Sequence, residues 1–246
     1  MTSADRPRVL ITGGGTGTGA DMAHAFAQAG HHVVITGRSI DRLAGVAGGN
    51  IRAIAGDVSD PCSVAEVFAK AGPCQIVIAN AGVAEAAPFG KVTLDHWHRM
   101  IATNLTGVFL TFQQGLAQMT AGGRLIAISS ISGLRGAAYA APYAASKHGV
   151  MGLVRSVALE VAKKGITANA ICPGYLDTDM TGRSIANVME KTGRTRVQAI
   201  ASLAGRNPQG RLIAPAEVTA TALWLASDAA ASVNGQAITL DGGESA

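Results

Sequence analysis

Short apolar runs alternate with longer amphipathic segments along most of this sequence, and this alternation limits the folds open to it. The apolar runs lie at 9–12, 33–36, 51–55, 76–79, 125–129, 167–171 and 237–240. They are apolar throughout rather than at every second position, which is typical of parallel strands covered on both faces. Helices are predicted at 17–29, from Ser39, and at 61–71, 93–118 (with a bend near Gly107), 142–164 and 215–226. Because parallel strands need helical crossovers, the sequence predicts an α/β fold with a doubly wound parallel sheet.

The chain length fits a single domain, 1–246, because α/β domains can reach about 200–250 residues without dividing. Apolar residues make up 48% of the chain and charged residues 15%, so a large core can form and disorder is excluded. Residues 175–214 do not follow the alternation of strands and helices. We expect this stretch to form a helical lid over the functional site.

Charge and cysteine patterns exclude several classes of partner. The formal net charge is +4, but the cations are dispersed and not interleaved with aromatic residues, so no nucleic-acid surface is predicted. No apolar stretch reaches 18 residues, so no membrane span is predicted. Cys62, Cys74 and Cys172 have neither metal-ligand spacing nor a disulfide pattern that uses all three. With no signal-peptide pattern after Met1, we expect a cytoplasmic protein without a metal site.

A glycine cluster, Gly13-Gly14-Gly15-Thr16-Gly17-Thr18-Gly19, joins the first predicted strand to the first predicted helix. Glycines let the backbone turn tightly and approach a pyrophosphate, whose charge is favoured at a helix N-terminus. A tight connection without a ligand is the alternative. The position of the cluster at the start of an α/β chain favours a Rossmann-like dinucleotide site.

Tyr143 and Lys147 lie four residues apart on a predicted helix and therefore share one face of it. A phenol has a pKa near ~10, and a neighbouring ammonium favours its ionised form. The pair could act as a general acid and base on an alcohol or a carbonyl. A surface tyrosine lying against a lysine stem is the simpler alternative.

The spacing Gly-x-x-x-Gly-x-Gly, taken together with Tyr-x-x-x-Lys, resembles the short-chain dehydrogenase/reductase family. Further motifs occur in the order and spacing of that family: Ala79-Asn80-Ala81-Gly82, Asn104-Leu105-Thr106-Gly107, Ser130 at 13 residues before Tyr143, and Pro173-Gly174-Tyr175-Leu176-Asp177-Thr178. The resemblance covers essentially the whole chain. It implies a nicotinamide-dependent oxidoreductase that acts on a carbonyl or a secondary alcohol.

The resemblance assigns four catalytic residues, Asn104, Ser130, Tyr143 and Lys147. It implies that Tyr143 exchanges a proton with the substrate oxygen and that Ser130 forms a hydrogen bond to the same oxygen. Lys147 would lower the pKa of Tyr143 and hold the nicotinamide ribose. Asn104 would hold a water molecule that connects Lys147 to solvent.

The resemblance also implies the residues that hold the cofactor: Gly13, Thr16, Gly17, Thr18, Gly19, Arg38, Ser39, Asp57, Val58, Asn80, Ala81, Gly82, Tyr143, Lys147, Pro173, Gly174, Leu176 and Thr178. Gly37 stands where an acidic residue would bind the ribose of NAD, and Arg38 can grip a phosphate. We therefore favour NADP(H), with NAD(H) possible, although Thr16 stands where NADP-dependent members often carry a basic residue. Asp57 could equally cap a turn.

Residues of the predicted lid bear on the substrate. Within the predicted lid, residues 181–212 contain one acidic residue, Glu190, and several cations that could meet the phosphates of coenzyme A or a carrier: Arg183, Lys191, Arg194, Arg196, Arg206 and Arg211. The segments around Tyr143 and Cys172 resemble 3-oxoacyl-thioester and polyketide ketoreductases. The segment 207–212 resembles enzymes of 3-hydroxyacyl-CoA or 3-hydroxybutyrate oxidation. We expect reversible reduction of a 3-oxoacyl thioester.

The sequence is also compatible with other functions and with an assembly. A cyclic alcohol, sugar or steroid could be the substrate, and a dinucleotide-binding regulator without turnover is an alternative of a different class. The resemblance implies a homo-oligomer, a tetramer or a dimer. An apolar stripe on the helix 142–164 is consistent with either an interface or core burial: Val150, Leu153, Val154, Val157 and Val161.

Overall fold

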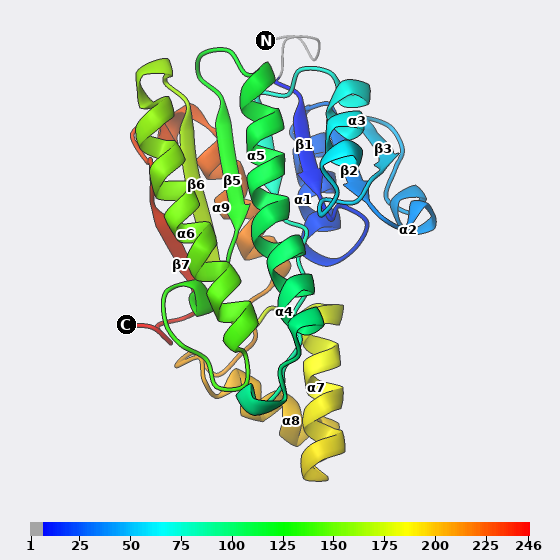
Figure 1. Ribbon diagram of the computed structural model, residues 1–246, viewed down its shortest axis with the longest axis vertical. Helices are drawn as coiled ribbons and strands as arrows, with labels where there is room; N and C mark the ends of the chain where they lie inside the picture. The colour runs from blue at the N-terminus through cyan, green and yellow to red at the C-terminus, as the bar shows by residue number, and fades with distance from the viewer. Residues whose placement is uncertain (1–6) are drawn as a thin grey trace.

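The computed structural model describes residues 7–246, without the side chain of Arg183, and contains one seven-stranded parallel sheet (Figure 1). Its strands are β1 (Val9–Thr12), β2 (Val33–Gly37), β3 (Ile51–Ala55), β4 (Ile76–Ala79), β5 (Arg124–Ile128), β6 (Thr167–Pro173) and β7 (Ala237–Leu240). Their order is β3-β2-β1-β4-β5-β6-β7, and every neighbouring pair is parallel. The chain winds outward from β1 in one direction and from β4 in the other, which confirms the predicted doubly wound sheet.

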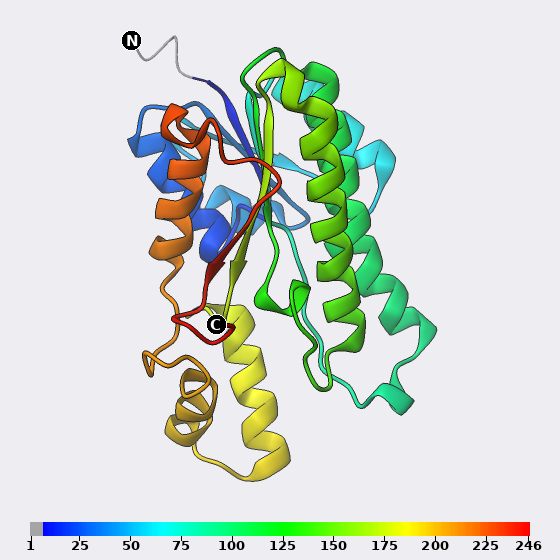
Figure 2. The same ribbon diagram turned by 90° about the vertical axis from the view of Figure 1, so that its left-hand side faces the viewer.

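Helices cover both faces of the sheet (Figures 1 and 2). They are α1 (Gly17–Gln28), α2 (Ile40–Ala44), α3 (Pro61–Ala71), α4 (Leu94–Ile101), α5 (Gly107–Gln118), α6 (Ala141–Val161), α7 (Asp179–Thr192), α8 (Arg196–Ala204) and α9 (Pro215–Ala226). Short 3₁₀ turns, η2 (Phe89–Lys91), η4 (Ile131–Gly133), η5 (Ala162–Lys164) and η6 (Asp228–Ala230), lie in the connections. No helix in the range 7–246 is long and apolar enough to cross a membrane.

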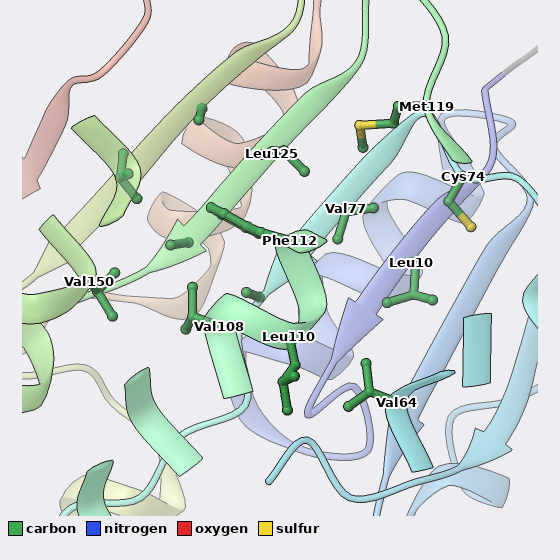
Figure 3. Packing of buried hydrophobic residues seen from close by; sticks show 14 of the residues in the cluster. Leu10, Val64, Cys74, Val77, Val108, Leu110, Phe112, Met119, Leu125 and Val150 are labelled. Atoms are coloured by element: carbon green, nitrogen blue, oxygen red, sulfur yellow. The ribbon is translucent and has the colours of Figure 1, made fainter. Parts of the chain in front are cut away.

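Two hydrophobic clusters lie on opposite faces of the sheet. Successive residues of one strand contribute to different clusters, as Leu10 and Ile11 do, because side chains alternate across a strand. Figure 3 shows the first cluster, in which Phe112 and Val108 of α5 face Val77 and Leu125. Burial of each such side chain contributes about 1.5–3 kcal/mol. Both faces of the strands are covered, which explains their uniformly apolar sequences.

The apolar stripe on α6 belongs to this core. Val150, Val154 and Val161 are buried in the first cluster, and Leu153 and Val157 pack against it. Of the two interpretations left open by the sequence, core burial is therefore the one that the structure shows for this stripe.

The predicted helix 93–118 is divided in three. A π-helical turn, η3 (Ala102–Thr106), separates α4 from α5, and it ends just before Gly107. A Cβ atom on Gly107 would lie 2.8 Å from Cγ2 of Val58, so the glycine allows close contact with the loop after β3. Single π-helical turns are frequent at functional sites, and this one carries Asn104.

The predicted helical lid consists of α7 and α8, which project beyond the carboxyl ends of the strands (Figures 1 and 2). The lid has a small hydrophobic cluster of its own, formed by Ile185, Ala199 and Leu203. A capping box between Thr195 and Gln198 begins α8, because each side chain accepts a hydrogen bond from the other residue's backbone.

Candidate active site

The glycine loop is tied to the end of β4 by a residue that the sequence analysis did not single out. Oγ1 of Thr12 accepts hydrogen bonds from the backbone N–H groups of Asn80 and Ala81, both at 3.0 Å. In return, Nδ2 of Asn80 donates to the carbonyl oxygens of Thr12 (2.9 Å) and Gly13 (3.3 Å). A buried threonine at the end of a central strand was the available signal, since a buried hydroxyl needs a partner.

The glycine loop fits a pyrophosphate. Gly13 and Gly17 have φ angles of +68° and +53°, which favour glycine, and a Cβ atom on Gly19 would overlap with the carbonyl of Gly13. Thr16 is the N-cap of α1 but forms no side-chain hydrogen bond with its first turn, and that turn contains no acidic residue. The first backbone N–H groups of α1 are therefore available to an anion.

Arg38 and Asp57 are brought together beyond the ends of β2 and β3. Oδ1 of Asp57 accepts hydrogen bonds from the N–H (2.9 Å) and hydroxyl (2.7 Å) of Ser59. Burial raises the pKa of Asp57, but these hydrogen bonds and the charge of Arg38 outweigh it and hold the pKa below its usual value. Asp57 thus caps a turn through Oδ1, whether or not it also contacts adenine. Ser39 caps α2 by accepting from the N–H of Arg42 at 3.4 Å.

Asn104 connects the loop after β4 to α6. Its Oδ1 accepts from the N–H of Val83 (2.8 Å), and its Nδ2 donates to the carbonyl of Val83 (2.9 Å) and to Oγ of Ser146 (3.3 Å). Gly82 lies between the amide of Asn104 and the ammonium of Lys147. A Cβ atom on Gly82 would be 3.4 Å from Oδ1 of Asn104 and 3.8 Å from Nζ of Lys147. A water molecule held by Asn104 stays a prediction.

Ser146 is a second residue that the sequence analysis missed. It is fully buried, donates to the carbonyl of Tyr143 at 2.7 Å, and accepts from Asn104. Its position directly before Lys147, three residues after Tyr143, was the only signal in the sequence. Ser146 therefore fixes the first turn of α6 to the π-helical turn.

Tyr143 and Lys147 lie together on α6, as their spacing predicted. Nζ of Lys147 is 5.8 Å from the centre of the Tyr143 ring and donates to the carbonyl of Ile128 at 2.8 Å. Lys147 is 4% exposed, and burial lowers its pKa to about 8. Burial disfavours the ammonium form, so Lys147 releases its proton at a lower pH than an exposed lysine does.

The pKa of Tyr143 is shifted in the direction opposite to the one expected from the sequence. Burial raises it, and the hydrogen bond with Ser130 only partly opposes that effect. The ammonium of Lys147 does not reverse the shift, because it is bonded to Ile128 and its own pKa is depressed. In this structure, Tyr143 is a phenol that keeps its proton at neutral pH.

Ser130 begins the turn η4 and faces the phenol of Tyr143. Its Oγ accepts from the N–H of Ser132 at 3.1 Å. Beneath it, the thiol of Cys172 is fully buried, and burial raises its pKa although Ser130, Ser129 and Lys147 lie close to it. The structure therefore brings Ser130, Tyr143 and Lys147 together at the carboxyl ends of β5 and β6.

The segment after β6 reaches from this group to the glycine loop. Gly174 donates to the carbonyl of Leu240 at 3.0 Å, and Leu176 pairs with Ile213 at the base of the lid. Thr178 is the N-cap of α7, and its Cγ2 would lie 3.6 Å from a Cβ atom on Gly17. The predicted cofactor residues of this segment thus lie between the phosphate end and the tyrosine.

The cations of the lid do not form one cluster. Arg211 donates to both carboxylate oxygens of Glu217 (2.6 and 3.0 Å), and Arg206 lies 5.5 Å from the centre of the Tyr175 ring. Lys191, Arg194 and Arg196 are exposed where α7 joins α8, at the end of the lid far from the sheet (Figure 2). The side chain of Arg183 lies outside the described residues. A contact between these cations and the phosphates of coenzyme A or a carrier stays a prediction, and Arg211 is already paired with Glu217.

A glycine loop that fits a pyrophosphate lies at the same edge of the sheet as a half-buried tyrosine and a buried lysine. This arrangement defines a nicotinamide-dependent oxidoreductase of the Rossmann type. The profile of a protein family described as "Enoyl-(Acyl carrier protein) reductase" matches residues 14–245. This chain belongs to the short-chain dehydrogenase/reductase family.

Individual relatives are similar over nearly their whole length. D-beta-hydroxybutyrate dehydrogenase of Rhizobium meliloti is 34% identical over 250 residues, which cover 95% of this chain and 96% of that protein. The 3-oxoacyl-(acyl-carrier-protein) reductase MabA of Mycobacterium bovis is 36% identical over 241 residues, with 96% and 91% covered. The crystal structure of a variant of actinorhodin polyketide ketoreductase with NADPH has a TM-score of 0.91 and 31% identity, and 99% of each chain is covered.

Proposed function

We propose that this enzyme reversibly reduces the carbonyl group of a 3-oxoacyl thioester, carried by coenzyme A or an acyl carrier, to the 3-hydroxy form. The convergence of Ser130, Tyr143 and Lys147 beside the segment 173–178 carries the proposal for the carbonyl chemistry. The thioester is supported by the name of the MabA relative, and the 3-hydroxy position by the name of the hydroxybutyrate dehydrogenase.

In the proposed mechanism, the phenol of Tyr143 donates its proton to the substrate oxygen, and Ser130 donates a hydrogen bond to the same atom. The raised pKa of Tyr143 suits it to be a proton donor, because the phenol is protonated at neutral pH. The nicotinamide cofactor supplies or accepts the hydride when it is bound. Lys147 holds the ribose of the cofactor and restores the proton of Tyr143.

NADP(H) is the proposed cofactor. Support comes from Arg38, which lies beside Asp57 beyond β2, and from Gly37, where no carboxylate opposes a 2′-phosphate. A Cβ atom on Gly37 would be 3.7 Å from Leu43, an ordinary contact, so the fold can accept a larger residue there. The double substitution Gly37→Asp with Arg38→Ala should therefore reverse the preference, by at least about tenfold in kcat/KM, from NADPH towards NADH. A preference that stays unchanged would contradict the proposal.

The decisive experiment is the reduction of acetoacetyl-CoA by the purified protein with NADPH and with NADH at equal concentration. Turnover with NADPH supports the substrate and the cofactor, and turnover with NADH alone keeps only the substrate. Tyr143→Phe is the matched control, and it should lower kcat by about 10²–10⁴-fold while nucleotide binding persists.

Failure of this assay separates the alternatives. Turnover of a cyclic alcohol, a sugar or a steroid, but not of acetoacetyl-CoA, would keep the carbonyl chemistry and replace the substrate. NADPH binding without turnover of any carbonyl in a broad panel would favour a regulator.

A homo-oligomer is also part of the proposal. Large apolar side chains are exposed on the outer surfaces of three helices: Phe109 on α5 (42% exposed), Leu159 on α6 (82%) and Trp224 on α9 (41%). Exposed apolar side chains of this size suit a contact with a second copy of the chain. A cytoplasmic location stays a prediction from the sequence.

A further inference from the structure

Arg135 joins the catalytic loop to the last residues of the sequence, 241–246. It follows η4, and its backbone N–H donates to the carbonyl of Ile131, the residue after Ser130, at 3.1 Å. Its guanidinium donates from Nη1 to the backbone carbonyl of Glu244 (3.0 Å) and from Nη2 to Oε1 of the Glu244 carboxylate. The side chain of Glu244 is 7% exposed. A buried carboxylate needs such a partner, so the Arg135–Glu244 pair is a structural interaction and differs from an exposed surface ion pair.

The segment 241–246 is held in a defined turn. The carboxylate of Asp241 accepts from the N–H groups of Gly243 (3.0 Å) and Ser245 (2.9 Å) and from the hydroxyl of Ser245. Burial raises the pKa of Asp241, but these hydrogen bonds and the charge of Arg135 lower it below its usual value. Arg135 therefore lies close to two carboxylates of this segment, those of Asp241 and Glu244.

The same segment touches two other parts of the site. A Cβ atom on Gly174, in the turn that follows β6, would lie 3.4 Å from Cβ of Asp241 and 3.5 Å from Oε2 of Glu244. A Cβ atom on Gly242, whose φ angle is +63°, would overlap with Asn207 at the base of the lid. The segment is thus in contact with the catalytic loop, the turn after β6 and the lid.

We propose that Arg135 is a positioning residue of this enzyme, which acts through Glu244 to fix the distance between Ser130 and the Pro173-Gly174 turn. Under the proposed function, Ser130 would hold the substrate oxygen and the Pro173-Gly174 turn would hold the nicotinamide. Their separation would then set how closely substrate and cofactor meet. This inference rests on the proposed function, because it requires that both groups meet a substrate and a cofactor.

The rigidity of η4 makes this coupling effective. A Cβ atom on Gly133 would lie 2.7 Å from the carbonyl oxygen of Lys147, so the turn is packed directly on α6. Arg135 follows this turn directly. A displacement of Arg135 would therefore also displace Ser130, because the connection between them is not a flexible loop. A misplacement of about 1 Å between reacting groups can lower a rate by about 100-fold.

The test compares Arg135→Ala, Glu244→Ala and the double variant with the wild type. We expect kcat to fall about tenfold in each single variant and no further in the double variant, because the two side chains act as one unit. Arg135→Lys keeps the charge and should recover part of the loss. Binding of 2′,5′-ADP, measured by calorimetry, should stay within about twofold of wild type, because its site at the other end of the cofactor does not contact Arg135. A merely structural defect would weaken both properties.

Lys70→Ala is the matched control, because Lys70 forms an exposed ion pair with Glu66 on α3, remote from the site. Wild-type kcat in both single variants, or effects that multiply in the double variant, would overturn the proposal. If the alanine variants do not fold, Glu244→Gln is nearly isosteric and should still lower kcat. The two proposals can fail independently. The substrate proposal fails if the wild type does not reduce acetoacetyl-CoA. The positioning proposal is tested by kcat ratios on any carbonyl that the wild type does reduce.

Discussion

Lys147 is the residue at which burial and charge conflict most directly. Its ammonium has one hydrogen-bond acceptor nearby, the carbonyl of Ile128, and no carboxylate within reach in the described part of the chain. The fold therefore bears the cost of a buried cation at neutral pH, at the position that we propose for proton exchange with Tyr143. Such a conflict is typical of a site that is organised for chemistry rather than for stability.

Replacement of Lys147 by methionine should change how stability depends on pH. The unfolded chain holds the lysine proton up to about pH 10.5, whereas the folded protein releases it near pH 8. Between these values the unfolded state binds more protons, so the free energy of unfolding contributed by Lys147 rises with pH, by about 3 kcal/mol in total. Urea unfolding of both proteins from pH 7.5 to 10 measures the difference. The free energy of unfolding of the wild type minus that of Lys147→Met should rise with pH. A flat or falling difference would show that the pKa of Lys147 is not depressed.

Ser146→Ala should cost stability and activity together. Loss of the hydroxyl removes one acceptor from the buried amide of Asn104 and one donor from the carbonyl of Tyr143. We expect the free energy of unfolding to fall by about 1–2 kcal/mol. Ser156→Ala, at an exposed position of α6, is the control. Equal stability of the two variants would mean that Ser146 is not a required partner of Asn104.

At this scale, the sequence indicated the reactive residues but not their electrostatics. The spacing of Tyr143 and Lys147 on a helix was enough to place them together. The direction of the Tyr143 pKa shift depends on how deeply the ring is buried and on where the Lys147 ammonium points. Both are tertiary properties, and Ser146 was missed for the same reason.

Among the elements, the break between α4 and α5 has the clearest functional meaning. The turn η3 adds a residue to the helical repeat and directs Asn104 towards the loop after β4. Its next residue, Leu105, packs against Gly149 of α6, where a Cβ atom would be 2.7 Å from Leu105 Cδ2. Gly149 therefore allows η3 and α6 to pack closely, while Asn104 of η3 bonds to the loop after β4.

Two glycines of α6 should therefore respond in opposite ways to alanine. Gly152 has no atom within 4 Å of its added Cβ position, so Gly152→Ala should stabilise the helix by about 0.5–1 kcal/mol. Gly149→Ala meets Leu105 and should destabilise by about 1–3 kcal/mol. Thermal unfolding by circular dichroism compares them. Equal shifts would contradict the packing described here.

Element positions were predictable because each strand and helix has a local pattern. The strands 51–55, 76–79 and 237–240 and the helices 61–71 and 215–226 were predicted with the bounds that the structure has. The π-helical turn could not be predicted, since Ala102–Thr106 is compatible with an ordinary α-helix. Its cause lies in contacts with Val83 and α6 that a local pattern does not contain.

On the scale of the whole molecule, one face of the sheet is covered by α3, α5 and α6, and the other by α1, α2 and α9. The sequence predicted this doubly wound arrangement because continuously apolar strands need cover on both faces. The sequence did not show how the lid cations are distributed, because the pairing of Arg211 with Glu217 depends on how the lid meets α9.

Leu159→Glu should dissociate a homo-oligomer. Leu159 is 82% exposed on α6, and a buried, unpaired carboxylate at its position would disfavour contact between two apolar surfaces. Light scattering after size-exclusion chromatography should give a smaller mass for this variant than for the wild type. Val197→Glu, at a position of α8 that is 76% exposed, is the control and should leave the mass unchanged. A wild-type protein that is already monomeric would refute the proposed assembly.

The separate hydrophobic cluster of the lid has a consequence for natural variation. Ile185, Ala199 and Leu203 pack among themselves, apart from the two clusters that hold the sheet together. Distant, independent sites have additive effects on stability, so changes within the lid cluster should not alter how the two sheet clusters pack. Lineages can therefore explore new lid sequences, and with them new substrates, without disturbing the residues that handle the carbonyl.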